Sequence, residues 1–287
     1  MSEIPCIQSI DHLLDYAISQ LAETSETAAL DAEVLLSHCL QKNRSFLRAW
    51  PEHLPAEWQI SDFMQLLKSR RNGVPVAYLT GKREFWSRDF AVSPAVLIPR
   101  PDSELLIELA LELLPHGQPR KIIDLGTGSG ILALTLAAER PLANVLATDI
   151  SAPALKVAQQ NAAQLQLNNV HFFESSWFDR ITHTEFDLVI SNPPYISAND
   201  PHLQQGDVRF EPEIALVSPV DGLQAIRQIA EQARKYLKPH GWLLIEHGYN
   251  QQVAVQNLFQ RFKYQKIQTH RDLSGNPRVT SGLRSPL

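Results

Sequence analysis

The chain has 287 residues, of which 44% are hydrophobic and 20% are charged, with a net charge of −5. This composition excludes a chain that is disordered throughout, because enough apolar surface is available to build a core. Lys and Arg are outnumbered by Asp and Glu, 26 to 31. Binding to a phosphate backbone normally needs the opposite balance, so no direct nucleic-acid substrate is expected.

The start of the chain lacks the features of a secretory signal. Met1-Ser2-Glu3-Ile4-Pro5 has neither a basic beginning nor an apolar run. No stretch of the chain approaches the roughly 18 apolar residues of a transmembrane span. The two cysteines, Cys6 and Cys39, are too few for a disulfide framework or a structural zinc site. We therefore expect a cytoplasmic protein with no membrane partner, no metal site and reduced thiols, with Cys39 in a helical core.

Residues 1–79 are predicted to form a bundle of helices. Ser9 can cap a first helix, whose apolar residues are spaced three and four apart. The same spacing recurs over residues 26–40, and a third helix is expected from Pro55 to Gly73. Three large side chains of this part are expected to pack in its core: Trp50, Trp58 and Met64.

Residues 80–98 are predicted to form a β-hairpin linker, because two short aromatic runs flank a polar turn. Residues 99–287 alternate short strands with helices, which is typical of a doubly wound, mainly parallel sheet. The expected strands are 121–125, 144–149, 170–173, 186–191 and 242–246. One helix and a final hairpin are expected over 251–287. The fold class is therefore α/β with an N-terminal helical bundle.

A glycine-rich loop, Asp124-Leu125-Gly126-Thr127-Gly128-Ser129-Gly130, follows the first of these strands. Glycines let a ligand approach the backbone, and the next helix offers free N–H groups. The spacing matches neither the dinucleotide fingerprint nor the P-loop. Asp149 ends the second strand, where it can accept hydrogen bonds from ribose hydroxyls, and Asp124 suits the orientation of a bound cation. The loop with Asp149 resembles the S-adenosylmethionine (AdoMet) site of class I methyltransferases.

The tetrapeptide Asn192-Pro193-Pro194-Tyr195 follows the fourth strand, at the sheet edge where the ligand crevice is expected. A planar NH₂ group is a weak nucleophile, since its lone pair is conjugated. The Asn192 side-chain oxygen and the Pro193 carbonyl can accept its two N–H bonds and stabilise the positive charge that forms during methylation. Tyr195 can pack on the planar group. We take Asn192, Pro193 and Tyr195 as catalytic candidates, and Pro194 completes the substrate site.

The tetrapeptide resembles the motif of amino-group methyltransferases, which act on adenine amines or on glutamine amides. A longer pattern discriminates between these acceptors, because residues 73–107 are similar to the linker and domain entry of the HemK-like protein-glutamine methyltransferases. That pattern includes Glu84-Phe85-Trp86 and Ile98-Pro99-Arg100-Pro101-Asp102-Ser103-Glu104. Four further stretches resemble the same family: Arg44 with Leu47 and Trp50, Arg209 to Glu213, Asp221-Gly222-Leu223, and Glu246-His247-Gly248 with Gln251.

This family methylates the glutamine of the Gly-Gly-Gln motif in class 1 peptide chain release factors. The resemblance therefore implies a Rossmann-like fold, AdoMet as methyl donor with S-adenosylhomocysteine as product, and release factors as partners. It implies that Asn192 to Tyr195 hold the glutamine amide, with Asn192 also bordering the cofactor. Trp177 is expected beside the adenine of the cofactor or, alternatively, in the protein core. Phe90 and the Arg100-Pro101 turn are expected to line the entry to the site or to form a structural hinge. Glu211 and Glu246 are expected to shape loops.

The helical part has a natural role under this interpretation. Residues 1–80 carry six basic and ten acidic side chains, a balance of −4, and we expect this acidic surface to grip the release factor. Two alternatives stay open. An adenine amine methyltransferase would be expected to carry a basic surface, which the composition lacks. A non-catalytic AdoMet-binding protein would have no need of the intact tetrapeptide.

Overall fold

The computed structural model describes residues 9–182 and 184–286, which form two compact units. The first unit contains the chain up to Gly81 together with Gln205–Phe210, and the second contains Lys82–Gln204 and the chain from Glu211 onward. The predictions made for Met1 to Pro5 and for Cys6 lie outside the described residues.

The first unit is helical, as predicted. Its helices are α1 (Ile10–Leu21), α2 (Ala28–Leu40), α3 (Arg44–Ala49), α4 (Glu57–Arg71) and α5 (Val76–Thr80). The Ser9 side chain accepts a hydrogen bond from the His12 backbone N–H and so caps α1, as the sequence predicts. Buried aliphatic residues of α1 and α2 meet Phe63 and Leu67 of α4 in one core. Cys39 lies in this core, and burial raises the pKa of its thiol to about 11.

The expectation that Trp50 and Trp58 are core residues is wrong, since their side chains are 59% and 62% exposed. Helix geometry explains Trp58. It lies nine residues before the buried Leu67, and nine steps of about 100° place it on the opposite side of α4. Trp50 follows the last residue of the short helix α3, whose buried residue is Leu47. Met64 packs against the core, as expected.

A buried ion pair holds the first unit together. Arg70 of α4 donates to Asp31 of α2 over 2.7 Å, and both side chains are about nine-tenths buried. Asp31 also accepts from the hydroxyls of Ser25 and Thr27, so its carboxylate is well satisfied. Arg70 donates in addition to Asp207 over 3.0 Å, and this contact attaches Gln205–Phe210 to the helical unit.

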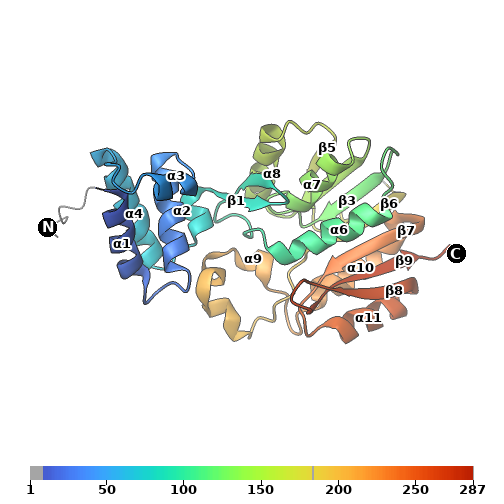
Figure 1. Ribbon diagram of the computed structural model, residues 1–287. Coiled ribbons are helices and arrows are strands. Elements are labelled where there is room, and N and C mark those ends of the chain that lie inside the picture. Colours follow the sequence, from blue (N-terminus) through green and yellow to red (C-terminus); the bar gives the residue numbers. More distant parts are fainter. Residues whose placement is uncertain (1–8, 183, 287) are drawn as a thin grey trace. The chain divides into compact units, whose positions relative to one another are not determined.

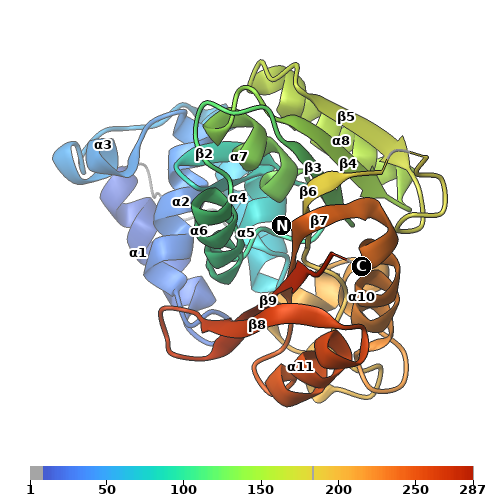
Figure 2. The same cartoon turned by 90° about the vertical axis from the view of Figure 1, so that its right-hand side faces the viewer.

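The second unit is an α/β fold, as predicted. Its hairpin is β1 (Lys82–Phe85) and β2 (Arg88–Ala91), and its main strands are β3 (Lys121–Leu125), β4 (Asn144–Asp149), β5 (Val170–Glu174), β6 (Phe186–Ser191), β7 (Leu237–Glu246), β8 (Tyr264–Arg271) and β9 (Pro277–Arg284). The main strands form one sheet in the order β5-β4-β3-β6-β7-β9-β8 (Figure 2). β9 runs antiparallel to both of its neighbours, β7 and β8, and the other neighbouring pairs are parallel.

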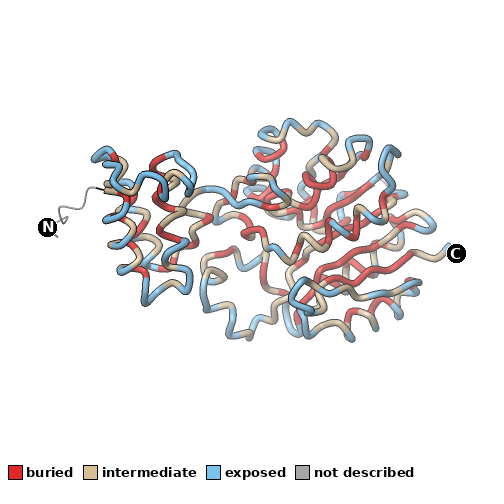
Figure 3. Tube along the Cα trace, in the orientation of Figure 1, coloured by how far each residue is buried: buried red, intermediate tan, exposed pale blue. Residues whose placement is uncertain are grey.

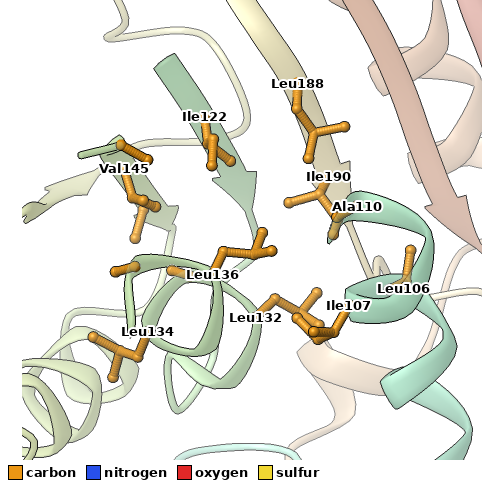
Figure 4. Close-up of a cluster of buried hydrophobic side chains, with 14 of the residues drawn as sticks. Leu106, Ile107, Ala110, Ile122, Leu132, Leu134, Leu136, Val145, Leu188 and Ile190 are labelled. Atoms are coloured by element: carbon orange, nitrogen blue, oxygen red, sulfur yellow. The ribbon is translucent and has the colours of Figure 1, made fainter. Parts of the chain in front are cut away.

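Helices cover both faces of this sheet (Figure 1). They are α6 (Glu104–Leu113), α7 (Ile131–Glu139), α8 (Ala152–Gln164), α10 (Gln224–Tyr236) and α11 (Gln252–Arg261), and the short helix α9 (Glu213–Leu216) lies between β6 and α10 in the chain. Neighbouring strand residues point to opposite faces. Ile122 packs with α6 and α7, as Figure 4 shows, whereas Ile123 packs with α10 and α11. The central strands are therefore buried on both sides (Figure 3).

The predicted hairpin is present and is fastened to the second unit. Phe85 and Phe90 are buried in the core on the α7 side of the sheet, with their rings 6.3 Å apart. The side-chain amide of Asn161 in α8 both donates to and accepts from the backbone of Ala91. Phe90 is thus a core residue rather than part of an entry. In the described ranges no helix combines the length and the apolar character needed to cross a membrane.

Replacing Arg70 by Met should lower the free energy of unfolding by about 3 kcal/mol, because it leaves the Asp31 carboxylate buried without its charged partner. Chemical denaturation followed by tryptophan fluorescence measures the loss. The matched control is Arg48→Met, which breaks an exposed pair with Glu33 in the same unit and should cost less than about 1 kcal/mol. Equal losses in the two variants would contradict a stabilising role for the buried pair.

Candidate active site

The register of the parallel strands brings the candidate segments to one edge of the sheet. Leu125, the last residue of β3, is paired with both Thr148 of β4 and Ser191 of β6. The Ser191 hydroxyl donates to the Leu125 carbonyl over 2.7 Å. The glycine loop, Asp149 and the tetrapeptide therefore begin side by side, at the carboxyl ends of neighbouring strands.

The glycine loop is held by backbone contacts to β4. The N–H groups of Gly126 and Thr127 both donate to the Thr148 carbonyl over 2.8 Å, and the Gly128 N–H donates to the Asp149 carboxylate over 2.9 Å. Gly128 has a φ of +56°, and a Cβ added to it would meet no heavy atom within 4 Å. The loop thus leaves open space where a side chain would otherwise stand.

Gly130 serves packing rather than ligand approach. Its φ is +87°, and an added Cβ would lie 2.9 Å from the Leu134 side chain and 3.2 Å from that of Ala158. Only glycine lets α7 start this close to α8. The third glycine of the motif is therefore required by the packing of two helices.

Asp124 lies buried below the glycine loop and does not line the cavity at this edge of the sheet. One carboxylate oxygen accepts from the Thr127 hydroxyl over 2.6 Å and from the Ala133 N–H. The other oxygen has no hydrogen-bond partner among the described residues. Burial raises the pKa of Asp124 to about 7, against the lowering effect of those two bonds. Asp124 thus fixes the loop from below instead of facing a bound cation.

A cavity of about 280 Å³ lies at this edge, within the second unit. Eight of the predicted site residues line it: Gly126, Thr127, Gly128, Ser129, Asp149, Trp177, Asn192 and Pro194. Three others are not part of its lining: Gly130, Pro193 and Tyr195. The structure therefore brings most of the predicted cofactor residues and the first residue of the tetrapeptide to one cavity.

The lining of this cavity suits AdoMet. The Asp149 carboxylate is fixed by the N–H groups of Gly128 and Ser151, and a carboxylate has acceptor sites left for a ribose diol. The ring of Trp177, which follows β5, lies 3.4 Å from where a Cβ of Gly126 would stand. Trp177 also packs against the core on the α10 side. Both roles weighed for this tryptophan are thus compatible with its place.

Three distant stretches converge on Tyr195. Its hydroxyl donates to Glu246 over 3.3 Å, and its carbonyl accepts from the Gln251 side chain over 3.0 Å. A Cβ on Gly222 would lie 2.4 Å from that carbonyl oxygen, so only glycine fits there. Burial and the Glu246 charge raise the pKa of Tyr195. The stretches around Gly222 and Gln251 thus hold the tetrapeptide from behind.

Two more carboxylates of the predicted set are buried beside the cavity. Glu211 accepts from Arg100, which lines the cavity, over 2.6 Å and from the Ile98 N–H over 3.3 Å. Glu246 accepts from the Ser103 hydroxyl over 2.7 Å. Both carboxylates bind protein groups of neighbouring segments, which is the behaviour of residues that shape loops.

Sequence reasoning missed several residues of the cavity. Ile150 and Ser151 follow β4, and Ser175 and Ser176 follow β5. Their position immediately after strand ends was a usable signal, because that edge of the sheet carries the site. Ser103 also lines the cavity, from just before α6; it belongs to the family pattern in the sequence, but no role in the site is predicted for it there.

Family models and known proteins match nearly the whole chain. Residues 12–81 match the model of the PrmC N-terminal domain, and residues 102–207 match that of the Methyltransferase small domain. The release factor glutamine methyltransferase of Shewanella oneidensis is 46% identical over 282 residues, which cover 98% of this chain and 97% of that protein. The Escherichia coli protein of the same name is 48% identical over 271 residues, which cover 94% and 97%.

A solved structure shows the same fold at low sequence identity. The 16S rRNA N2 G1207 methyltransferase of Thermus thermophilus, in complex with AdoMet and guanosine, matches with a TM-score of 0.51 at 21% identity. The match covers 71% of this chain and 49% of that one. The second unit therefore has the fold of class I methyltransferases, as predicted.

Replacing Gly128 by Ala should weaken AdoMet binding about tenfold or more, because the added methyl group would enter the space open to a ligand. Calorimetric titration measures this affinity. Gly117→Ala is the matched control, since Gly117 also has a positive φ and open space around its missing Cβ but lies outside the cavity lining. Both variants should lose similar stability. Unchanged AdoMet affinity in Gly128→Ala would contradict the assignment of the loop.

Proposed function

Because the chain belongs to the release factor glutamine methyltransferase family, we propose that it methylates the glutamine of the Gly-Gly-Gln motif in class 1 peptide chain release factors, with AdoMet as methyl donor. The observation that carries the proposal is the meeting of the glycine loop, Asp149 and Asn192 around one cavity. A donor site and an acceptor motif are then adjacent, as a direct methyl transfer requires.

In this proposal the glycine loop and Asp149 hold AdoMet, with Trp177 beside the adenine. When bound, AdoMet supplies an electrophilic methyl group on its sulfonium sulfur. Asp149 accepts from the ribose hydroxyls with the lone pairs that Gly128 and Ser151 leave to it. The open space at Gly128 lets the ligand contact the loop backbone.

The tetrapeptide acts on the other reactant, the glutamine amide. The amide lone pair is conjugated with its carbonyl, so the nitrogen gains positive charge as its new bond forms. The Asn192 oxygen and the Pro193 carbonyl accept the two N–H bonds and stabilise that charge, an effect worth roughly 3 kcal/mol for one such contact. The ring of Tyr195, fixed through its hydroxyl by Glu246, packs on the planar amide. No general base is needed, because the proton leaves to water after the transfer.

We assign recognition of the release factor to residues 1–79, with residues 80–98 as linker and 99–287 as the catalytic part. A single glutamine side chain offers few contacts, so specificity needs a larger surface. The helical unit exposes three large apolar side chains within nine residues: Trp50, Leu54 and Trp58. Exposed tryptophans are typical anchors of protein interfaces. We place the reaction in the cytoplasm, where translation ends, with neither a membrane nor a nucleic acid as substrate.

Intact-mass spectrometry of a class 1 release factor incubated with this protein and AdoMet tests the function directly. We expect one added methyl group, which peptide mapping should locate on the glutamine of the Gly-Gly-Gln motif.

Asn192→Ala should lower kcat by about two to three orders of magnitude while it spares AdoMet affinity. Asp149→Ala should instead weaken AdoMet binding first. Loss of cofactor binding in Asn192→Ala would show that the two sites are not separate.

Replacing both Trp50 and Trp58 by Ala should raise the KM for the release factor at least about 30-fold, since one interface anchor is worth about 2 kcal/mol. The value of kcat at saturating release factor and the AdoMet affinity should not change. Leu30→Ala, which removes another exposed apolar side chain of the same unit, is the control. If the KM of the double variant equals that of this control, the two tryptophans do not belong to the recognition surface.

A further inference from the structure

A chain of hydrogen bonds runs from the cavity wall to a buried carboxyl group. The side-chain nitrogen of Asn192 donates to the Ser103 hydroxyl over 3.0 Å. That hydroxyl donates to one oxygen of Glu246 over 2.7 Å. Ser103 and Glu246 are buried, with 0% and 1% of their surface exposed. Ser103 and Asn192 line the cavity, whereas Glu246 lies behind them.

The chemistry of these groups fixes the direction of the chain. An ionised carboxylate only accepts hydrogen bonds, so the Ser103 hydroxyl uses its single O–H to donate a hydrogen bond to Glu246. The Ser103 oxygen then serves as an acceptor, and only the NH₂ end of the Asn192 amide can donate to it. The oxygen of that planar amide is on the side away from Ser103. It is the atom that must accept from a methyl acceptor.

Glu246 is connected by hydrogen bonds to both ends of the tetrapeptide. Its second oxygen accepts from the Tyr195 hydroxyl over 3.3 Å. Its own position is set by the sheet, since Ser191 of β6 is paired with Ile245 of β7 and the next residues are Asn192 and Glu246. One carboxylate thus orients the first residue of the tetrapeptide through Ser103 and the last residue directly.

We propose that Ser103 and Glu246 are positioning residues that hold the Asn192 amide with its oxygen toward the glutamine substrate. The proposal rests on the proposed function, because that function gives the Asn192 oxygen its role as acceptor. Neither residue touches the reacting atoms. They disfavour the flipped orientation of the Asn192 amide, in which its oxygen and nitrogen exchange places. In that orientation the NH₂ group would face and repel the N–H groups of the substrate.

Protonation of Glu246 reverses this arrangement. The groups that face Glu246 are Ser103, Tyr195, Arg278 and Asp102. Burial raises the pKa of Glu246 to about 7, although the Ser103 bond and Arg278 lower it. A protonated Glu246 can donate to Ser103, whose own proton then points to Asn192 and favours the flipped amide. This chain of hydrogen bonds from Glu246 through Ser103 to Asn192, here called the relay, is therefore intact above a pH of about 7. It is lost as the pH falls through this value.

The first arm of the test measures kcat for release factor methylation. Ser103→Ala should lower kcat about 10- to 100-fold, the range found when a partner that orients a ligating side chain is removed. AdoMet affinity should stay within about twofold of the wild-type value. Ser103→Thr keeps the hydroxyl and should restore most of the lost kcat. Wild-type kcat should fall as the pH is lowered through about 7, and Glu246→Gln should flatten this step.

The matched control is Asp187→Asn. Asp187 is a half-buried carboxylate of the second unit, and it binds Lys238 and Arg120. It lies near the beginning of β6, at the opposite end from Asn192. This variant should melt at a lower temperature with unchanged kcat and an unchanged pH profile. A fall in kcat equal to that of Ser103→Ala would mean that lost stability explains both, and the positioning role would be refuted.

The second arm does not depend on activity. The side-chain NH₂ signals of Asn192 are identified by NMR through their loss in Asn192→Asp. In the wild type above a pH of about 7, one of these protons should exchange slowly because it is bonded to Ser103, and Ser103→Ala should abolish this protection. Equal exchange in both proteins would overturn the relay. So would wild-type kcat in Ser103→Ala when Asn192→Ala is inactive. Absence of methylation by the wild type counts against the proposed function alone.

Discussion

The parallel register of β4, β3, β6 and β7 is the constraint on which the whole site depends. Leu125 is paired with Thr148 and Ser191, and Ser191 with Ile245. The residues that follow these positions are therefore neighbours, although the chain between them is long. A slip of one residue in any pair would turn every side chain of that strand to the other face. Two cores prevent it, because alternate strand residues are buried on opposite faces of the sheet.

Much of this arrangement was predictable because its signals are local. The glycine loop stands between a short apolar strand and a helix, and the tetrapeptide stands directly after a strand. The rule that ligands bind at the carboxyl ends of parallel strands then places both at one edge. The hairpin over β1 and β2 was predictable for the same reason, since its aromatic runs and its turn are contiguous in the sequence.

The features that sequence reasoning missed depend on contacts between distant segments. In the sequence Ser103 is only one residue of the pattern from Ile98 to Glu104, and nothing there shows that Glu246, 143 residues further along the chain, accepts a hydrogen bond from its hydroxyl. Gln205–Phe210 belongs with the helical unit because Asp207 binds Arg70. The exposure of Trp50 and Trp58 follows from which faces of α3 and α4 are buried. The large apolar ring of tryptophan favours burial in general, and the residue type alone cannot reveal such an exception.

Two buried carboxyl groups stand behind the two halves of the site in the same manner. Asp124 accepts from Thr127 and Ala133 below the glycine loop, and Glu246 accepts from Ser103 and Tyr195 behind the tetrapeptide. Burial raises both pKa values to about 7. Each group therefore destabilises the folded chain increasingly as the pH rises toward that value. A carboxylate can nevertheless accept from two donors at once, as Asp124 and Glu246 both do. Burying the carboxylate lowers the free energy of unfolding, but it fixes the two loops in place before the substrate binds.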